Sequence, residues 1–153
     1  MNTHTIQALC ERSDAIARAA GWVKEGDPRP YHTAVILMLS ELSEALEDWR
    51  NNKTVLDTWY EYSEGGVSTT LLRSQVVGVI ALEEQKKFKP CGIPIELADF
   101  VIRVCQRCGT DGVATKLGEL YAARTDVPAY GSFEEMLAEV SLSVTLSYDV
   151  NAK

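Results

Sequence analysis

The sequence lacks the features that would assign it to a membrane or to an exported protein. No uninterrupted apolar run approaches the roughly 20 residues of a membrane-spanning helix. The first residues have neither the basic start nor the apolar centre of a signal peptide. We therefore expect a cytoplasmic protein with no membrane partner.

Positive charge is also scarce in this chain. The sequence has 22 acidic against 15 basic residues, a formal net charge of −7, and no long cluster of Lys or Arg. Proteins that bind nucleic acid through its phosphate backbone depend on such clusters. We therefore expect no nucleic acid partner.

Histidine and cysteine are sparse. The chain contains two histidines and four scattered cysteines, which are His4, His32, Cys10, Cys91, Cys105 and Cys108. Cys105 and Cys108 form a C-x-x-C motif, but no second Cys or His pair completes a zinc site and no βαβ pattern surrounds it. A chain of 153 residues can bury a core without disulfides. We expect reduced thiols, with Cys105 and Cys108 as small apolar core residues.

Apolar residues recur at helical spacing through most of the chain, which predicts an all-α fold, an antiparallel bundle of about five helices in a single domain, residues 1–153. The first predicted helix begins after Asn2 or Thr3 and ends at Gly21. The others run from Val35 to Asn51–Asn52, from Pro94 through Cys108 to a stop at Gly109, from Gly112 to Arg124, and from Ser132 toward Leu146. The Ser-, Thr- and Val-rich tail of the last helix favours a departure from the helical state. Residues 53–90 lack this periodicity and predict an irregular excursion with a possible small hairpin that begins with the short strand 59–62.

Two pairs of carboxylates lie inside apolar stretches. Glu41 and Glu44 belong to SELSEALEDW, and Glu96 and Asp99 belong to GIPIELADFVIRVC. Residues three apart share one side of a helix, and both pairs border an apolar face. A bare carboxylate in such surroundings is costly, so paired acids there are usually satisfied by a cation or by hydrogen bonds. An isolated E-x-x-E pair is more often a solvated face, but two pairs in an apolar context favour a metal site.

The ligand types indicate which metal to expect. Oxygen donors without thiolate or imidazole favour Mg²⁺ or Mn²⁺. A di-iron carboxylate bundle would need Glu-x-x-His motifs, and neither His4 nor His32 completes one. The sequence therefore predicts a magnesium or manganese site.

The order of the two motifs resembles a known superfamily. SELSEALEDWR, an E-x-x-E helix, is followed by KPCGIPIELADFVIRV (Lys89 to Val104), an E-x-x-D helix. Together they resemble the MazG-like all-α nucleoside triphosphate pyrophosphohydrolases, which are related to the dimeric dUTPases. The similarity covers residues 32–50 and 89–106 and is to short, often phage-encoded members, which would place this protein in a host cytoplasm. Many relatives have a further Glu where this chain has Ser40.

The resemblance implies a reaction, (d)NTP + H₂O → (d)NMP + pyrophosphate, and a MazG-like helical bundle that forms a homodimer or homotetramer. It implies that Glu41, Glu44, Glu96 and Asp99 are the catalytic residues and hold two or three Mg²⁺ or Mn²⁺ ions. Glu44 is our choice for the general base. It also leads us to expect a purine deoxynucleotide such as dGTP or dATP and a role in nucleotide-pool control.

Substrate contacts are predicted from residues near the motifs. Arg103 lies one helical turn beyond Asp99 and either contacts phosphate or neutralises Asp99 as a structural ion pair. A basic approach is formed by Lys86, Lys87 and Lys89. The candidates for an aromatic or apolar slot around the base are Trp22, His32, Trp49 and Trp59.

A second class of function stays open at this point. The chain is alternatively a catalytically idle helical regulator of the same fold that binds nucleotide or protein only. The absence of an acid at Ser40 favours this alternative, whereas retention of all four predicted carboxylates opposes it.

Overall fold

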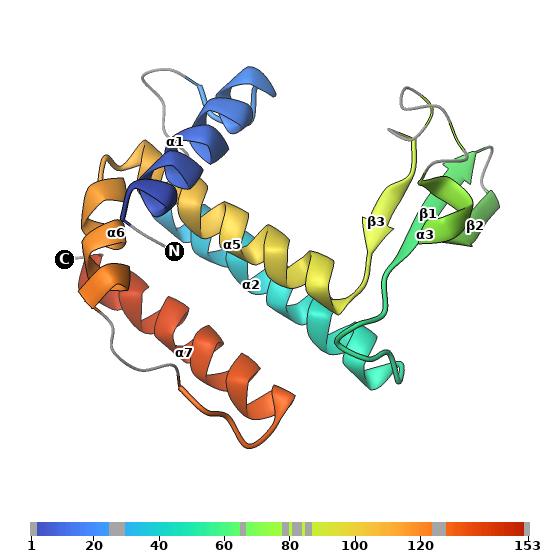
Figure 1. Ribbon diagram of the computed structural model, residues 1–153. Coiled ribbons are helices and arrows are strands. Elements are labelled where there is room, and N and C mark those ends of the chain that lie inside the picture. Colours follow the sequence, from blue (N-terminus) through green and yellow to red (C-terminus); the bar gives the residue numbers. More distant parts are fainter. Residues whose placement is uncertain are drawn as a thin grey trace. The chain divides into compact units, whose positions relative to one another are not determined.

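The computed structural model is mostly helical and contains one small sheet (Figure 1). It describes residues 3–24, 30–64, 67–77, 80, 84, 87–123 and 128–151. The helices in these residues are α1 (Thr3–Ala19), α2 (Tyr31–Arg50), α3 (Arg73–Val76), α5 (Ile93–Thr110), α6 (Ala114–Ala123) and α7 (Phe133–Asn151). The strands are β1 (Trp59–Glu64), β2 (Val67–Leu72) and β3 (Lys89–Cys91). The expectation of a mostly helical chain is confirmed, but the three-stranded sheet departs from a purely helical fold.

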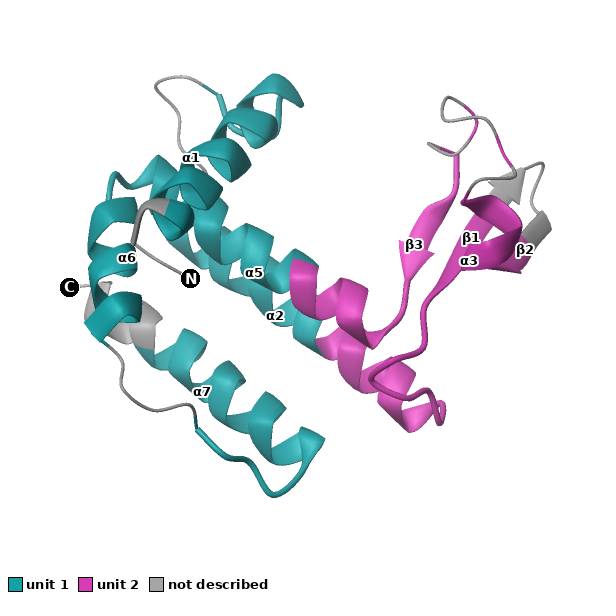
Figure 2. Ribbon diagram, in the orientation of Figure 1, with its two compact units in different colours: residues 1–42, 99–153 teal, residues 43–98 magenta. Residues whose placement is uncertain are grey.

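The chain divides into two compact units, residues 1–42 with 99–153 and residues 43–98 (Figure 2). Helices α2 and α5 each continue through the division, so each unit contains part of both helices. That residues 1–153 form a single domain stays a prediction. Within the described residues, every helix is too short or too polar to cross a lipid bilayer.

The core of the first unit is built from α1, α5 and α6. Its fully packed members are Ile6, Cys10, Cys105 and Ala114, with Leu9, Cys108 and Leu117 packed against them. Burial raises the pKa of Cys105 to about 12 and that of Cys108 to about 11, so both thiols stay protonated at neutral pH. All four cysteines are free. The expectation that Cys105 and Cys108 are core residues is confirmed.

Gly109 is not the stop that its position predicted. It lies inside α5, which ends one residue later and is closed by Gly112 at φ +71°. A Cβ at Gly109 would lie 2.6 Å from the carbonyl oxygen of Cys10 and 2.9 Å from the Cβ of Asp14. Gly109 is therefore needed for the close approach of α1 and α5, whereas Gly112 supplies the left-handed conformation that ends the helix.

Left-handed residues end α1 and α2 as the sequence predicts. Gly21 has φ +74°, its N–H donates to the Arg18 carbonyl at 2.9 Å, and the next N–H, of Trp22, donates to the Ala17 carbonyl at 3.0 Å. Asn52, with φ 59°, closes α2 with the equivalent pair of hydrogen bonds. These bonds satisfy carbonyls that the ends of the helices would otherwise leave unpaired.

The last two helices agree with the prediction except at the tail of α7, and the predicted end of the fourth helix at Arg124 lies outside the described residues. Ser132 starts α7 because its Oγ accepts a hydrogen bond from the Glu135 N–H at 3.1 Å. The helix then continues to Asn151, so the expected departure of the tail from the helical state is wrong. Thr145 shows how a hydroxyl residue fits this helix, because its Oγ1 donates to the Ser141 carbonyl at 2.9 Å.

The sheet of the second unit has the strand order β2-β1-β3, with both pairs antiparallel. The pairing of β1 with β2 confirms the predicted hairpin, and the predicted short strand 59–62 is the start of β1. Tyr62 on β1 stacks against Phe88, with ring centroids 5.0 Å apart. Residues 65 and 66, between β1 and β2, lie outside the described residues.

The close approach at Gly109 predicts a specific sensitivity. Gly109→Ala would push a methyl group against the Cys10 carbonyl, and we expect a loss of about 1–3 kcal/mol of unfolding free energy. Urea denaturation followed by circular dichroism measures this loss. The matched control is Gly112→Asn, since no atom lies within 4 Å of the added Cβ and Asn tolerates the left-handed conformation. Equal stability of Gly109→Ala and the wild type would contradict the described crossing of α1 and α5.

Candidate metal centre

Glu41 and Glu44 project from α2 beside its buried apolar face. Met38, Leu42 and Ala45 form this face. Glu41 borders it and is only 5% exposed, whereas the Glu44 side chain is 47% exposed. Because the two residues are one helical turn apart, both carboxylates lie along one side of α2.

The start of α5 positions Glu96. Gly92, between β3 and α5, has φ +117°, and its carbonyl accepts hydrogen bonds from the N–H groups of Ile95 at 2.8 Å and Glu96 at 3.1 Å. A Cβ at Gly92 would lie 2.3 Å from the Asp57 carbonyl oxygen, so this joint requires glycine. Glu96 is thereby held in the first turn of α5, where the helix dipole favours an acid, and it is 3% exposed.

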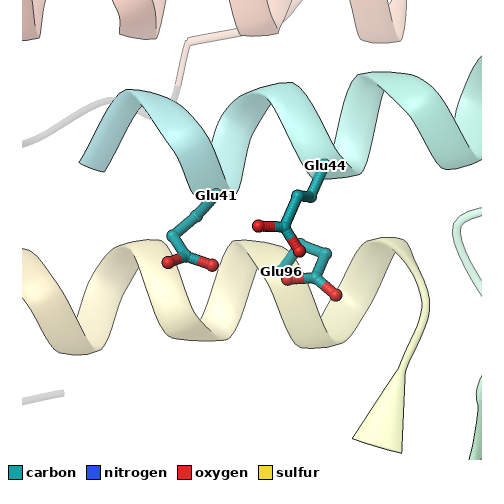
Figure 3. Close-up of side chains that lie close together, drawn as sticks. All are labelled: Glu41, Glu44 and Glu96. Atoms are coloured by element: carbon teal, nitrogen blue, oxygen red, sulfur yellow. The ribbon is translucent and has the colours of Figure 1, made fainter. Parts of the chain in front are cut away.

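The carboxylates of Glu41, Glu44 and Glu96 come together. Each offers one oxygen atom, and these oxygens all lie within 4.8 Å of one another. Figure 3 shows Glu41 and Glu44 reaching from α2 toward α5, which carries Glu96. Negative charges at this spacing repel one another, so the arrangement favours a cation among them. A donor set made of carboxylate oxygens fits Mg²⁺ or Mn²⁺.

Two basic side chains contact these carboxylates. Nε of Arg103 donates a hydrogen bond to Oε1 of Glu41, so this guanidinium pairs with Glu41 on the other helix. Nζ of Lys89 lies 3.4 Å from Oε2 of Glu44. Burial acts against the charge of Lys89, but the negative charges of Glu44 and Glu96 outweigh it and raise the pKa of Lys89 above its ordinary value. The site therefore attracts positive charge from the protein's own side chains.

Asp99, the fourth predicted ligand, is not one of the three clustered carboxylates. It lines a cavity of about 330 Å³ between α1 and α5. The other lining residues are Leu9, Arg12, Ser13, Ile16, Ala17, Trp22, Ile102, Arg103 and Gln106. Arg103 thus belongs to this cavity and also contacts Glu41. A metal-ligand role for Asp99 stays a prediction.

Three residues predicted to contact substrate lie elsewhere than on this cavity. His32 is exposed in the first turn of α2, and Trp49 is half-buried in its last turn. Trp59 on β1 donates its indole N–H to Oε1 of Glu61 at 3.1 Å. Nζ of Lys53 lies 5.0 Å from the centroid of the Trp59 ring, so a cation already covers one face of that ring. The binding roles of His32, Trp49 and Trp59 stay predictions.

The basic approach that the sequence predicts is described in part. Lys89 lies beside Glu44, and Lys87 forms an ion pair with Glu84 at 2.6 Å. Lys86 lies outside the described residues. Lys89 is therefore the member of this group that the structure links to the clustered carboxylates.

Sequence reasoning missed Arg12, Ser13 and Gln106, which line the cavity. The sequence contained a signal for Gln106, because this residue follows Arg103 by three positions and so lies on the same side of α5. The contribution of Arg12 and Ser13 depends on how α1 packs against α5, a long-range contact that a helical wheel does not contain.

No family model, curated protein or solved structure matches the chain. The resemblance carried by residues 40–50 and 89–104 therefore stays a prediction. The structure adds one observation of its own, which is that carboxylate oxygens of Glu41, Glu44 and Glu96 lie within 4.8 Å of one another.

The carboxylate cluster predicts direct metal binding in the absence of any substrate. We expect Mn²⁺ to raise the melting temperature of the wild type, because a ligand that binds only the folded state stabilises it. Glu44→Gln and Glu96→Gln should each lower Mn²⁺ affinity by more than about tenfold in isothermal titration calorimetry. Glu119→Gln is the control, since Glu119 is exposed on α6 and lies 3.5 Å from Lys116. Unchanged affinity in both site variants would exclude the proposed ligands.

Proposed function

We propose that this protein is a metal-dependent nucleoside triphosphate pyrophosphohydrolase of the MazG-like kind. The observation that carries the proposal is the group of Glu41, Glu44 and Glu96, carboxylates from two helices with oxygens within 4.8 Å of one another. The resemblance of the segments that contain these glutamates supports the same reaction. That reaction cleaves the α–β phosphoanhydride of a (d)NTP and yields (d)NMP and pyrophosphate.

All three glutamates would hold the metal ions in this reaction, and Glu44 has a second task. Glu41 and Glu96, both buried, would fix the positions of the ions. Mg²⁺ held by these residues would supply positive charge to the triphosphate and make the attacking water more acidic. Glu44 is the most exposed of the three and reaches bulk water, which supports it as the group that accepts the proton of that water.

Arg103 and Lys89 are the cations that contact the phosphates of the substrate. The Arg103 guanidinium contacts Glu41 and also lines the neighbouring cavity, so it stands between the carboxylates and a ligand in that cavity. Its planar fork suits a phosphate better than an ammonium group does. Lys89 beside Glu44 adds a second positive charge for the pyrophosphate leaving group.

The base of the nucleotide occupies the cavity between α1 and α5. Its walls combine apolar side chains, among them Leu9, Ile16 and Trp22, with a few polar groups, which is the composition of a small-molecule site. Trp22 is 63% exposed and offers an aromatic surface to a heterocyclic ring. This argument favours Trp22 over His32, Trp49 and Trp59 as the base contact. We retain the preference for a purine deoxynucleotide such as dGTP or dATP, because the larger ring covers more of the apolar wall.

The alternative is a catalytically idle regulator that binds nucleotide without cleaving it. Two observations favour it: Arg103 already neutralises Glu41, and Asp99 is not one of the clustered carboxylates. A regulator of this kind would bind nucleotide through the same cavity. It differs from the enzyme in releasing no product.

A panel of NTPs and dNTPs with Mg²⁺ or Mn²⁺ tests the proposal. We expect release of pyrophosphate and the nucleoside monophosphate, identified by ³¹P NMR, and loss of this activity when the metal is removed with EDTA. Glu96→Gln should lower kcat by about 100- to 1,000-fold, because the metal then loses a ligand. Glu119→Gln should retain wild-type activity.

The products separate the alternatives. Orthophosphate as the sole phosphorus product besides the nucleotide would indicate another phosphohydrolase. Nucleotide binding without turnover would support the regulator, and full activity of Glu96→Gln would exclude the carboxylate site as the catalytic centre.

A further inference from the structure

The amide of Gln106 is held in one orientation at the wall of the cavity. Its Nε2 atom lies 2.8 Å from Oγ1 of Thr110, one helical turn further along α5. The same Oγ1 lies 2.6 Å from Oδ1 of Asp14 on α1 and 3.0 Å from the backbone carbonyl oxygen of Gln106. Gln106, Thr110 and Asp14 therefore form one hydrogen-bonded network between the two helices.

The single proton of the Thr110 hydroxyl decides the direction of these bonds. Asp14 accepts at 2.6 Å, shorter than the 3.0 Å to the Gln106 carbonyl, as expected of a bond to a charged acceptor. Whether the hydroxyl donates to Asp14 or to the backbone carbonyl of Gln106, its proton is not directed at the Gln106 side chain. Oγ1 can then only accept from Gln106, so the atom of the amide facing Thr110 is the NH₂ group.

The charge of Asp14 strengthens this assignment. Burial acts to raise the pKa of Asp14, but hydrogen bonds from Thr110 and Arg18 outweigh it and hold the pKa below its ordinary value. Nε of Arg18 lies 2.7 Å from Oδ2 of Asp14. An ionised carboxylate only accepts hydrogen bonds, so Asp14 holds the Thr110 proton and leaves Oγ1 to accept from Gln106. This contact occupies Nε2, and Oε1 is the polar atom of the amide that it leaves for a ligand.

We propose that Gln106 determines base specificity, with its Oε1 accepting a hydrogen bond from an exocyclic amino group of the nucleobase. Asp14 and Thr110 are positioning residues that prevent the amide from turning over. This inference rests on the proposed function, in which the base occupies the cavity that Gln106 lines. It adds a chemical criterion for the substrate, since the protein selects a purine that carries an amino group.

The selection works because the amide cannot exchange its two ends. A freely rotating glutamine accepts from an amino group or donates to a carbonyl with equal ease, and so discriminates poorly. With Nε2 held by Thr110, which Asp14 orients, a base that presents an oxo group or a bare C–H loses a hydrogen bond. A site built to satisfy one polar group rejects the analogue that lacks it.

The test compares purines that differ in an amino group. Hypoxanthine in dITP lacks the 2-amino group of guanine and has an oxo group in place of the 6-amino group of adenine. For the wild type, kcat/KM for the better of dGTP and dATP should exceed that for dITP by roughly three- to tenfold, the worth of one neutral hydrogen bond. In Gln106→Met, which keeps the length of the side chain without the acceptor, the ratio should fall to about one.

A pair of variants at Thr110 separates positioning from a structural role. Thr110→Val removes the hydroxyl that holds the amide and should lower the same ratio, whereas Thr110→Ser keeps the hydroxyl and the ratio. Loss of stability alone would lower the amount of active protein and leave the ratio unchanged. A wild-type ratio near one, or a ratio that Gln106→Met does not change, would overturn the inference while pyrophosphate release leaves the proposed function intact.

Binding distinguishes the remaining outcomes. Isothermal titration calorimetry of dGMP, dAMP and dIMP with the full chain measures the same preference without turnover. Preferential binding of an amino-bearing purine without pyrophosphate release would sustain the role of Gln106 and overturn the proposed activity. Absence of both binding and turnover would overturn both.

Discussion

The ion pair between Glu41 and Arg103 is the interaction on which the functional part of the structure depends. A carboxylate that is 5% exposed needs a partner, and a buried charge left alone would be strongly destabilising. Arg103 supplies the partner from α5, so the pair links α2 to α5 within the first unit. The same guanidinium lines the cavity between α1 and α5. The Arg103 side chain therefore contacts the Glu41 carboxylate and also lines the apolar cavity.

The crowding of acids is the second constraint. Gly92 makes the sharp joint from β3 into α5, and this joint sets the positions of Lys89 before it and Glu96 after it. Lys89 in turn faces Glu44, whose charge raises the pKa of the lysine. Like charges held together lower stability, and proteins retain such arrangements where function requires them. The short stretch from Lys89 to Glu96 thus carries one of the clustered carboxylates and the cation that contacts another, Glu44.

The sequence predicted the elements better than it predicted their contacts. Helical periodicity placed Glu41 correctly beside an apolar face, because that property belongs to one helix. It grouped Asp99 with Glu96 as ligands, which stays a prediction, but it did not show that Asp99 lines a cavity, because spacing along α5 does not say which neighbouring element each residue faces. It took Gly109 for a helix end, because a glycine needed for close packing and a glycine needed for a left-handed turn look alike in sequence. The sequence also did not show that Trp22 lines this cavity, because that depends on how α1 packs against α5.

The apolar wall of the cavity has a consequence for how binding energy is divided. Ile16, Trp22 and Ile102 are 54%, 63% and 47% exposed, so a guest that covers them removes apolar surface from water. That contribution would be accompanied by a negative change in heat capacity and is not subject to the screening that weakens interactions between charges. In the proposed function, the contribution of Arg103 and the clustered glutamates would be electrostatic and would weaken as ionic strength rises. Temperature would then act mainly on the binding of the base, and salt on the binding of the phosphates.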